Sequence, residues 1–466
     1  MTGSPDQILT VAQMRAAEDA LMAAGETVDS LMQVAGRGAA DYVWRMAGHR
    51  AVTVLCGPGN NGGDGYVIAE SLRARGGTVR VVAPYEPATP AARNARAAFL
   101  GEVLDGAARP KGEVLVDCLF GSGLSRPLDP AGLTALTELA ASHALRIAVD
   151  MPSGIDSDAG IALNAWLPAY DLTLALGVWK YAHWLMPSCI AMGQRRLVPI
   201  GVGAVDGAAY LVAKPHFAPP APDAHKYSRG LALVAAGDMP GATLLACAAA
   251  MRGGAGYVKL VSDPAPAQRP PELVADTGSL DQALEDPRIG AVLTGPGMGR
   301  SPAMRERLQV VLGGSGPLVL DADALVLLKP EMLEGHERPL VATPHEGELE
   351  KLATAYGIDE TSKLHTARVL ARASGMVIVA KGPDTIVAAP DGRVAIARAA
   401  SSWLSVAGTG DVLAGLIVSR LATDAEPFAA ACEAVWLHGE AARLAGPVFT
   451  AAELVDRIPA AYAACL

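Results

Sequence analysis

Short apolar segments alternate with segments of helical periodicity along most of the chain. Two amphipathic helices are predicted first, at residues 10–24 and 27–46, because apolar side chains recur there at helical spacing and a threonine opens each segment. Strands and helices then alternate, which favours a doubly wound, mostly parallel sheet. The strands expected in this part are residues 51–56, 78–83, 114–120, 147–150 and 172–176, and a helix is expected at residues 66–75.

The alternation stops at residues 214–229. Four prolines fall between residues 214 and 223, and no periodicity is visible there. Such a segment is typical of an extended linker between domains. We therefore expect an N-terminal domain at residues 1–213, a linker at 214–229 and a C-terminal domain at 230–466.

A second alternating pattern follows the linker. Residues 384–389 and 393–397 are expected to form a hairpin that turns at Pro390-Asp391-Gly392. The fold class predicted for the whole chain is α/β, with two domains built on mostly parallel sheets. The other strands expected here are residues 231–235, 257–261, 291–294, 318–320, 340–342 and 376–380, and the expected helices are residues 241–252, 425–445 and 451–464.

The composition indicates which binding partners and which cellular compartment to expect for this protein. Of the 466 residues 51% are apolar, the net charge is −10, and there is no block rich in lysine and arginine. A nucleic-acid partner is therefore not expected, nor is a membrane, because no apolar run is long enough to span one. The six cysteines form no C-x-x-C pair and residues 1–9 carry no apolar signal segment, so we expect a cytoplasmic protein with reduced thiols.

A glycine turn runs directly into an apolar helix at Gly408-Thr409-Gly410-Asp411, and the helix is expected over residues 412–421. The first N–H groups of a helix have no internal partner and attract anions, and glycine lets a phosphate approach them closely. A carboxylate makes sense beside a phosphate if it takes a proton from a hydroxyl during phosphoryl transfer, so Asp411 is a candidate catalytic base. The alternative is an ordinary helix start with an aspartate near its cap.

A second glycine-rich turn, at residues 57–62, matches G-x-G-x-x-G between a strand and a helix. An NAD-dependent oxidoreductase is therefore one interpretation, with Glu86 as the acidic ligand of the ribose. Asn60, Asn61 and Asp64 speak against it, because they place polar groups and a carboxylate where a pyrophosphate would lie.

Polar loops also follow later strands of the first half. Asp117 precedes a glycine- and serine-rich loop, and Asp150 precedes a second one. In a doubly wound sheet such loops converge on one crevice. Asn61, Asp117 and Ser153 offer hard oxygen ligands that can hold a cation against an anionic substrate, although each of them can equally be a turn former.

The first half resembles the YjeF N-terminal family, the NAD(P)H-hydrate epimerases, in residues 59–65, 117–124 and 148–156. The resemblance implies a Rossmann-like domain that interconverts the two epimers of hydrated NADH and NADPH, with K⁺ bound at Asn61, Asp117 and Ser153. Asp150 is our first candidate for the proton transfer and Lys180 the second, although the surroundings of Lys180 depart from the family pattern. The implied substrate contacts are Asn60, Asn61, Gly62, Gly63, Asp64, Gly121, Ser122, Gly123, Leu124, Ser125, Arg126 and Pro127.

The second half resembles the YjeF C-terminal family, the ribokinase-like NAD(P)H-hydrate dehydratases. The segments that carry this resemblance are residues 226–230, 240–242, 253–256, 294–299, 321–325, 343–348, 381–385 and 407–415. It implies an α/β/α sandwich in which ADP, with Mg²⁺, activates the hydroxyl of the hydrate and becomes AMP. The implied contacts to the hydrate are Ala242, Gly297, His345 and Asp411, and those to the nucleotide are Lys381, Gly382, Pro383, Asp384, Thr385 and Gly410.

Local chemistry agrees with this second resemblance. Thr343-Pro344-His345-Glu346 is expected to be a capping box with Pro344 at the first helical position. Asp321 and Asp323 follow a strand and can help to hold Mg²⁺ through water, or can be turn formers.

The hypothesis for the whole chain is a fused, cytoplasmic repair enzyme that acts on hydrated NADH and NADPH and forms a homo-oligomer. One competing hypothesis is a ribokinase-type small-molecule kinase fused to an oxidoreductase-like domain, which would release a stable phosphorylated product. Another treats the first domain as a dinucleotide sensor without catalytic activity.

Overall fold

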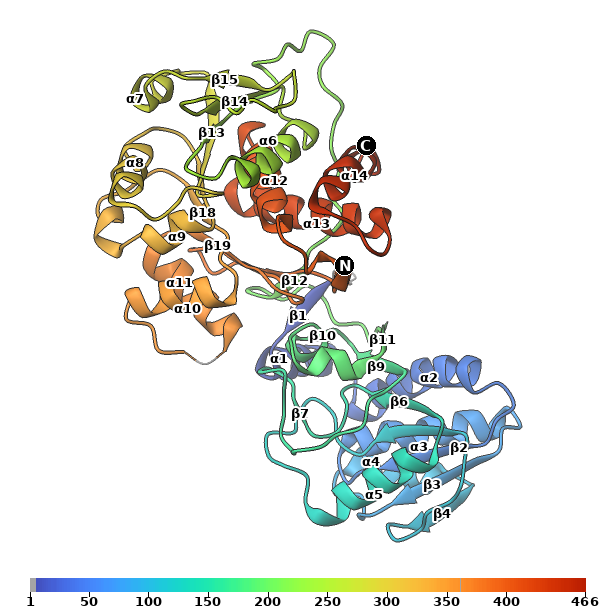
Figure 1. Ribbon diagram of the computed structural model, residues 1–466. Coiled ribbons are helices and arrows are strands. Elements are labelled where there is room, and N and C mark those ends of the chain that lie inside the picture. The colour runs from blue at the N-terminus through green and yellow to red at the C-terminus, as the bar shows by residue number, and fades with distance from the viewer. Residues whose placement is uncertain (1–5, 361) are drawn as a thin grey trace. The chain divides into compact units, whose positions relative to one another are not determined.

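The computed structural model describes residues 6–360 and 362–466. The chain divides into two compact units, Met1–Ala209 and Tyr210–Leu466, each built around a mostly parallel sheet (Figure 1). In the described ranges, no helix has both the length and the apolar character needed to cross a membrane. The α/β class with two units is as predicted, whereas the exact limits of the domains and of the linker stay predictions.

The N-terminal unit holds a seven-stranded sheet in which every pair of neighbouring strands is parallel. Its strands are β2 (Val52–Cys56), β3 (Val79–Ala83), β4 (Glu102–Asp105), β5 (Val114–Cys118), β6 (Leu145–Val149), β9 (Leu172–Leu176) and β11 (Gln194–Val198). The helices are α1 (Val11–Ala23), α2 (Val28–Ala47), α3 (Asn60–Ala74), α4 (Pro90–Ala98) and α5 (Pro130–Ser142). Short strands outside this sheet are β1 (Gln7–Leu9), β7 (Ile155–Asp156), β8 (Ile161–Ala162) and β10 (Trp179–Lys180).

The strand order of this sheet, β11-β9-β6-β5-β2-β3-β4, reverses direction at β2 and β5. Helices α2, α3 and α4 enclose the core on one face, and α5 packs on the other. The loops that follow β2, β5 and β6 therefore open at the point where ligands bind in doubly wound sheets.

The start of helix α1 is held by an N-cap and by the strand that precedes the helix. Thr10 caps it in a capping box with Gln13, and β1 pairs in parallel with β10, so that Leu9 lies opposite Lys180. Thr27 caps α2 in the same way, which confirms both threonine starts predicted from the sequence. The pairing brings α1 to the edge of the sheet where the loops open.

The C-terminal unit has the strand order β12-β21-β20-β19-β18-β17-β16-β13-β14-β15. These strands are β12 (Ala209–Leu211), β13 (Leu231–Ala235), β14 (Tyr257–Val261), β15 (Val274–Asp276), β16 (Ile289–Thr294), β17 (Leu318–Leu320), β18 (Leu340–Ala342), β19 (Val377–Ala380), β20 (Ile386–Ala388) and β21 (Val394–Ile396). The helices are α6 (Pro240–Arg252), α7 (Leu280–Leu284), α8 (Pro302–Leu312), α9 (Asp323–Leu327), α10 (Glu346–Ala355), α11 (Lys363–Ser374), α12 (Thr409–Ala422), α13 (Pro427–Ala445) and α14 (Ala451–Ala463).

Strands β13 to β19 of this unit are parallel to one another. β20 is antiparallel to β19 and forms the predicted antiparallel hairpin with β21. Helices α6, α12, α13 and α14 cover one face of the sheet, and α8 to α11 lie on the other (Figure 1). This arrangement is the α/β/α sandwich expected from the sequence.

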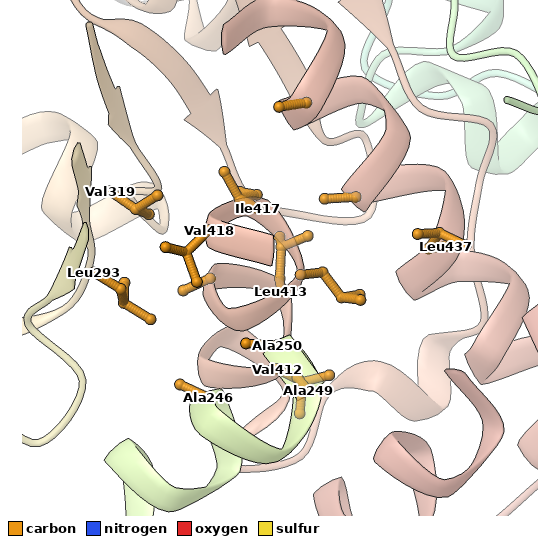
Figure 2. Packing of buried hydrophobic residues seen from close by; sticks show 14 of the residues in the cluster. Ala246, Ala249, Ala250, Leu293, Val319, Val412, Leu413, Ile417, Val418 and Leu437 are labelled. Carbon is orange, nitrogen blue, oxygen red and sulfur yellow. The ribbon is translucent and has the colours of Figure 1, made fainter. Parts of the chain in front are cut away.

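Helix α12 is the central helix of its layer. Val412, Leu413, Ile417 and Val418 are buried between the strands and the neighbouring helices (Figure 2). At Gly415 the helix touches α6 so closely that a Cβ atom would lie 2.2 Å from the carbonyl oxygen of Ala246. Only glycine permits this separation, so the alanine-rich α6 and the glycine of α12 pack backbone to backbone.

Candidate active sites

The asparagine-rich segment after β2 forms the first turns of α3. We expected residues 57–65 to be a turn with the helix starting at Tyr66, but α3 begins at Asn60. The reason is close backbone packing: a Cβ on Gly62 would lie 1.9 Å from the carbonyl oxygen of Gly57. The glycines therefore let the helix start immediately beside the strand end, with its unpaired N–H groups at the site.

A cavity of about 590 Å³ opens at this edge of the sheet. Its wall combines α1, α2, the start of α3, and the loops after β5 and β6. The residues predicted from the sequence that line it are Asn60, Asn61, Asp64, Gly121, Ser122, Gly123, Leu124, Ser125, Arg126, Asp150 and Lys180. Three of the predicted substrate contacts, Gly62, Gly63 and Pro127, are described in the structure but do not line this cavity.

Asp150 and Lys180 form a buried ion pair in the cavity wall. The Nζ atom of Lys180 lies 2.6 Å from Oδ1 of Asp150 and also donates to the carbonyl oxygen of Leu176 at 2.7 Å. The N–H of Ser122 donates to Oδ2 of Asp150 at 2.8 Å. Burial alone would raise the pKa of Asp150, but the ammonium group and these hydrogen bonds outweigh it and lower the pKa to about 2. Asp150 is therefore ionised at neutral pH.

His183 fixes the backbone on both sides of this ion pair. Its Nδ1 accepts the N–H of Lys180 at 2.9 Å, so the ring proton lies on Nε2, which donates to the carbonyl oxygen of Asp150 at 2.8 Å. Burial and the nearby Lys180 lower the pKa of His183 to about 4, which keeps the ring neutral. Sequence reasoning missed this residue, although its spacing of three from Lys180 was a usable signal.

Two other carboxyl groups face the same cavity, and their pKa values are raised where that of Asp150 is lowered. Burial, with the charges of Asp150 and Glu18, raises the pKa of Asp64 well above its usual value. Burial likewise raises the pKa of Glu18; the positive charge of Lys180 opposes this rise and the negative charge of Asp150 adds to it. Glu18 was missed because only the pairing of β1 with β10 brings α1 to the site. The cavity thus joins one carboxylate that stays ionised with two carboxyl groups whose pKa values are raised.

Asp117 and Ser153 are in direct contact behind the cavity. Oδ1 of Asp117 accepts from the hydroxyl of Ser153 at 2.7 Å and from the N–H of Leu119 at 3.0 Å. Oδ2 accepts from the N–H of Ser153 at 3.0 Å and from the hydroxyl of Tyr170 at 2.5 Å. Burial raises the pKa of Asp117, and these hydrogen bonds oppose the rise. The carboxylate therefore ties the loops after β5 and β6 together.

The amide of Asn61 lies beside these loops. It donates to the carbonyl oxygen of Val149 at 3.2 Å and accepts from the N–H of Gly121 at 3.3 Å. Asn61, Asp117 and Ser153 all carry hard oxygen atoms, the type of ligand that K⁺ prefers.

The second site lies at the start of α12. Asp411 is the third residue of the helix, and Gly408 caps it with a φ of 93°, a conformation that suits glycine. Thr409 and Gly410 form the first turn, whose N–H groups lack helical partners. The predicted glycine turn at a helix start is therefore present, although the helix starts three residues earlier than expected.

A lysine–aspartate pair lies beside this turn. Lys381, after β19, places its Nζ 2.7 Å from Oδ1 of Asp321, which follows β17 and is 1% exposed. A Cβ added to Gly410 would lie 3.3 Å from the same Nζ atom, so the ammonium group adjoins the start of α12. Burial and the charge of Asp321 raise the pKa of Asp411 to about 6, against the opposing effect of Lys381. A carboxyl group with that pKa can accept a proton near neutral pH.

The capping-box interpretation of Thr343-Pro344-His345-Glu346 was wrong in register. His345 is the cap of α10: its Nδ1 accepts from the N–H of Glu348 at 3.3 Å, and Pro344 precedes the helix. The hydroxyl of Thr343 donates instead to Oδ1 of Asp321 at 2.6 Å. The Thr343 hydroxyl is thus bonded to the buried carboxylate, and the acceptor for the first turn of α10 comes from His345.

The other predicted contacts of this unit lie on neighbouring loops. Asp384 is buried and pairs with Lys363 at 2.6 Å, and the hydroxyl of Thr385 donates to the carbonyl oxygen of Gly382 at 2.8 Å. These bonds shape the loop that follows Lys381 and contains Pro383. Gly297, with a φ of 64°, contacts the backbone just before α6, whose first turn contains Ala242.

Asp323 is engaged by its own partners. Its carboxylate accepts from the N–H of Gly299 at 2.9 Å and from Nε of Arg300 at 2.6 Å. Asp321 differs, because both hydrogen bonds described for its side chain end on Oδ1. Oδ2 of Asp321 is therefore the better candidate to receive a water ligand of a divalent cation.

This fold defines a two-domain α/β enzyme, with a candidate site at the carboxyl edge of each sheet. Residues 28–182 match the family described as YjeF-related protein N-terminus, and residues 232–459 match the NAD(P)H-hydrate dehydratase family. A bifunctional NAD(P)H-hydrate repair enzyme of Gloeobacter violaceus is 35% identical over 93% of this chain and 92% of its own. The enzyme of the same description from Escherichia coli K12 is 33% identical over 90% of this chain and 85% of its own.

Among solved structures, the ADP/ATP-dependent NAD(P)H-hydrate dehydratase of Bacillus subtilis, co-crystallised with ATP and Mg²⁺, is 29% identical. It covers 54% of this chain and 95% of its own, with a TM-score of 0.48. The sequence similarity to the Gloeobacter violaceus and Escherichia coli enzymes extends over both units of this chain. The chain belongs to the family of bifunctional NAD(P)H-hydrate repair enzymes.

Replacing Lys180 by methionine should destabilise the N-terminal unit by about 3 kcal/mol at pH 7, because the Asp150 carboxylate stays buried without its cation. In the unaltered protein Asp150 stabilises the fold above the unfolded pKa of about 3.9. That contribution is lost as the pH falls through the folded pKa of about 2. In K180M the ammonium group no longer opposes burial and the pKa of Asp150 rises, so the difference in stability should narrow from pH 7 towards pH 5.

Urea denaturation at several pH values measures this effect. The double variant D150N/K180M is the matched control, since it removes both charges and should recover most of the loss. Equal stability of K180M and the unaltered protein at pH 7 would contradict the assignment.

Proposed function

We propose that the N-terminal unit interconverts the (R) and (S) epimers of hydrated NADH and NADPH, and that the C-terminal unit dehydrates the (S) epimer while ADP becomes AMP and phosphate. The family membership gives the reaction class. The observation that carries the second reaction is the position of Asp411, in the anion-binding first turn of α12 and with a pKa raised to about 6. A fused protein is chemically reasonable, because only one epimer is consumed.

In the dehydratase, Asp411 takes the proton from the hydroxyl of the hydrate. The oxygen then attacks the terminal phosphorus of ADP and AMP leaves, while the N–H groups of Thr409 and Gly410 stabilise the charge on the transferring group. The carbon–oxygen bond of the phosphate ester breaks next, and the neighbouring ring carbon loses a proton. These steps restore the ring double bond and release inorganic phosphate.

Lys381, with Gly382, Pro383, Asp384 and Thr385, supplies the nucleotide contacts in this proposal, together with Gly410. Asp321 holds Lys381 beside the start of α12. Ala242, Gly297 and His345 contact the hydrate. Mg²⁺ bound with the nucleotide would neutralise phosphate charge, with Oδ2 of Asp321 binding one of its waters.

In the epimerase, the reacting carbon carries both a hydroxyl group and the ring nitrogen. Protonation of the hydroxyl by Glu18 or Asp64 lets it leave as water, and the nitrogen lone pair forms a carbon–nitrogen double bond. Water then adds to the opposite face and gives its proton to Asp150. Lys180 keeps Asp150 ionised for this role. Asn60, Asn61 and the loop from Gly121 to Pro127 hold the dinucleotide.

Potassium in the epimerase site would be held by Asn61, Asp117 and Ser153 and would supply positive charge against the substrate phosphates. The hard oxygen atoms of these three side chains and the direct contact of Asp117 with Ser153 support this assignment. Exchange of K⁺ for Li⁺ should slow epimerisation severalfold, because Li⁺ is too small for these ligands, and should leave the dehydratase rate unchanged. Equal epimerisation rates in the two salts would remove potassium from the proposal.

Mixing both epimers with the protein, ADP and Mg²⁺ should return the absorbance of reduced nicotinamide for both of them. Recovery of the (S) epimer alone, with the (R) epimer lost only at its spontaneous rate, would mean that the first unit is a sensor without catalytic activity. A stable phosphorylated product without free phosphate would favour a small-molecule kinase. Phosphate release and absorbance are followed in the same sample.

Asp411→Asn should lower the ADP-dependent rate by a factor on the order of 10² to 10⁴, because the base is lost. In the unaltered protein kcat/KM should fall about tenfold per pH unit below the Asp411 pKa of about 6, since the carboxylate must be ionised. The exposed carboxylate Asp456 provides the control variant D456N, which should keep the full rate. A near-normal rate of D411N would refute the base assignment.

We also place the protein in the cytoplasm. All six cysteines are free thiols, and most are buried, as expected for a reducing compartment.

A further inference from the structure

One side chain outside the predicted site touches the anion-binding turn from behind. His438 lies on α13, and its Nε2 atom is 3.0 Å from the carbonyl oxygen of Thr409, in the first turn of α12. The adjacent Leu437 is fully buried in the core shared by α12 and α13 (Figure 2). The packing of the two helices therefore sets the position of the imidazole.

The direction of this hydrogen bond follows from its acceptor. A carbonyl oxygen only accepts, so Nε2 of His438 carries the proton. Burial lowers the pKa of His438 to about 4, although the bond to Thr409 opposes the shift. The ring is thus a neutral donor throughout the neutral pH range, and its protonation does not interfere with the titration of Asp411.

The carbonyl group of Thr409 and the N–H of Gly410 belong to the same peptide unit. A donor on the oxygen polarises the peptide and strengthens the N–H as a donor on its other side. The N–H of Gly410 is one of the groups at the start of α12 without a helical partner, beside Lys381. A hydrogen bond from His438 therefore acts on the end of the peptide that faces the phosphate.

The rest of the turn is held by other contacts. The hydroxyl of Thr409 lies 2.9 Å from the carbonyl oxygen of Leu404 and 3.0 Å from that of Val406, which ties the turn to the preceding loop. Gly408 supplies the left-handed cap. Among the described residues, the bond from His438 is the hydrogen bond that this turn receives from a side chain of another helix.

We propose that His438 is a positioning residue of the dehydratase: its Nε2–H holds and polarises the Thr409–Gly410 peptide so that the Gly410 N–H meets the transferring phosphoryl group. The proposal rests on the phosphoryl-transfer reaction given above for this site. His438 does not touch the substrate in this role, and it acts through the peptide. Its effect should therefore appear in the rate of the chemical step more than in nucleotide binding.

The test compares His438→Leu, which removes the donor at similar volume, with His438→Gln, whose amide N–H can reach the same carbonyl oxygen. H438L should lower kcat of the ADP-dependent reaction about fivefold to tenfold, as expected for one neutral hydrogen bond, with a smaller change in KM for ADP. H438Q should restore most of kcat. Epimerisation by the same molecules should not change, which makes the N-terminal unit an internal measure of active concentration.

Leu260→Ala is the matched control for packing, because it opens a cavity in the core of the same unit, on β14 rather than on α13, without removing a donor. It should lower the thermal stability at least as much as H438L does while kcat stays within about twofold. If L260A and H438L lose kcat in proportion to stability, or if H438Q is no better than H438L, His438 has only a structural role and the proposal is overturned. If the unaltered protein consumes no ADP with the hydrate, the proposed reaction itself fails, which is a distinguishable result.

Discussion

A buried aspartate held by a lysine at the carboxyl edge of a parallel sheet is the interaction on which both sites depend. Asp150 and Lys180 form it in the N-terminal unit, at 2.6 Å, and Asp321 and Lys381 form it in the C-terminal unit, at 2.7 Å. Each pair joins residues from separate strand ends, so the charges also fix the loops. A charge buried without its partner would cost several kcal/mol, and this cost makes the geometry of each site specific.

The two lysine–aspartate pairs have different effects on the pKa of the carboxyl group proposed to transfer the proton. In the first unit the lysine contacts Asp150 itself and keeps it ionised. In the second unit the lysine is bound to Asp321. Burial and the negative charge of Asp321 raise the pKa of Asp411 to about 6, and the lysine opposes this rise. The same two residue types therefore produce a permanently charged group in one site and a proton acceptor in the other.

Local sequence patterns predicted the alternating elements, the hairpin of β20 and β21, and the turn before Asp411. They failed where distant segments decide the outcome. Glu18 reaches its cavity only because β1 pairs with β10, and His438 reaches Thr409 only through the packing of α13 on α12. The start of α3 at Asn60 depends on close contact with Gly57. His345 rather than Thr343 caps α10, and the Thr343 hydroxyl donates to the buried Asp321. The homo-oligomer and the roles of the site residues stay predictions.

The glycine at position 415 has a consequence for how a nucleotide is recognised. Since α12 rests with its main chain against α6, the helix has no room to slide or roll when a ligand arrives. The donors at its tip are preset, so their orientation costs nothing at the moment of reaction. Adaptation to different nucleotides must then come from the ligand and the surrounding loops. A bulkier side chain at position 415 would shift the N–H groups at the start of α12 without contacting any reactant.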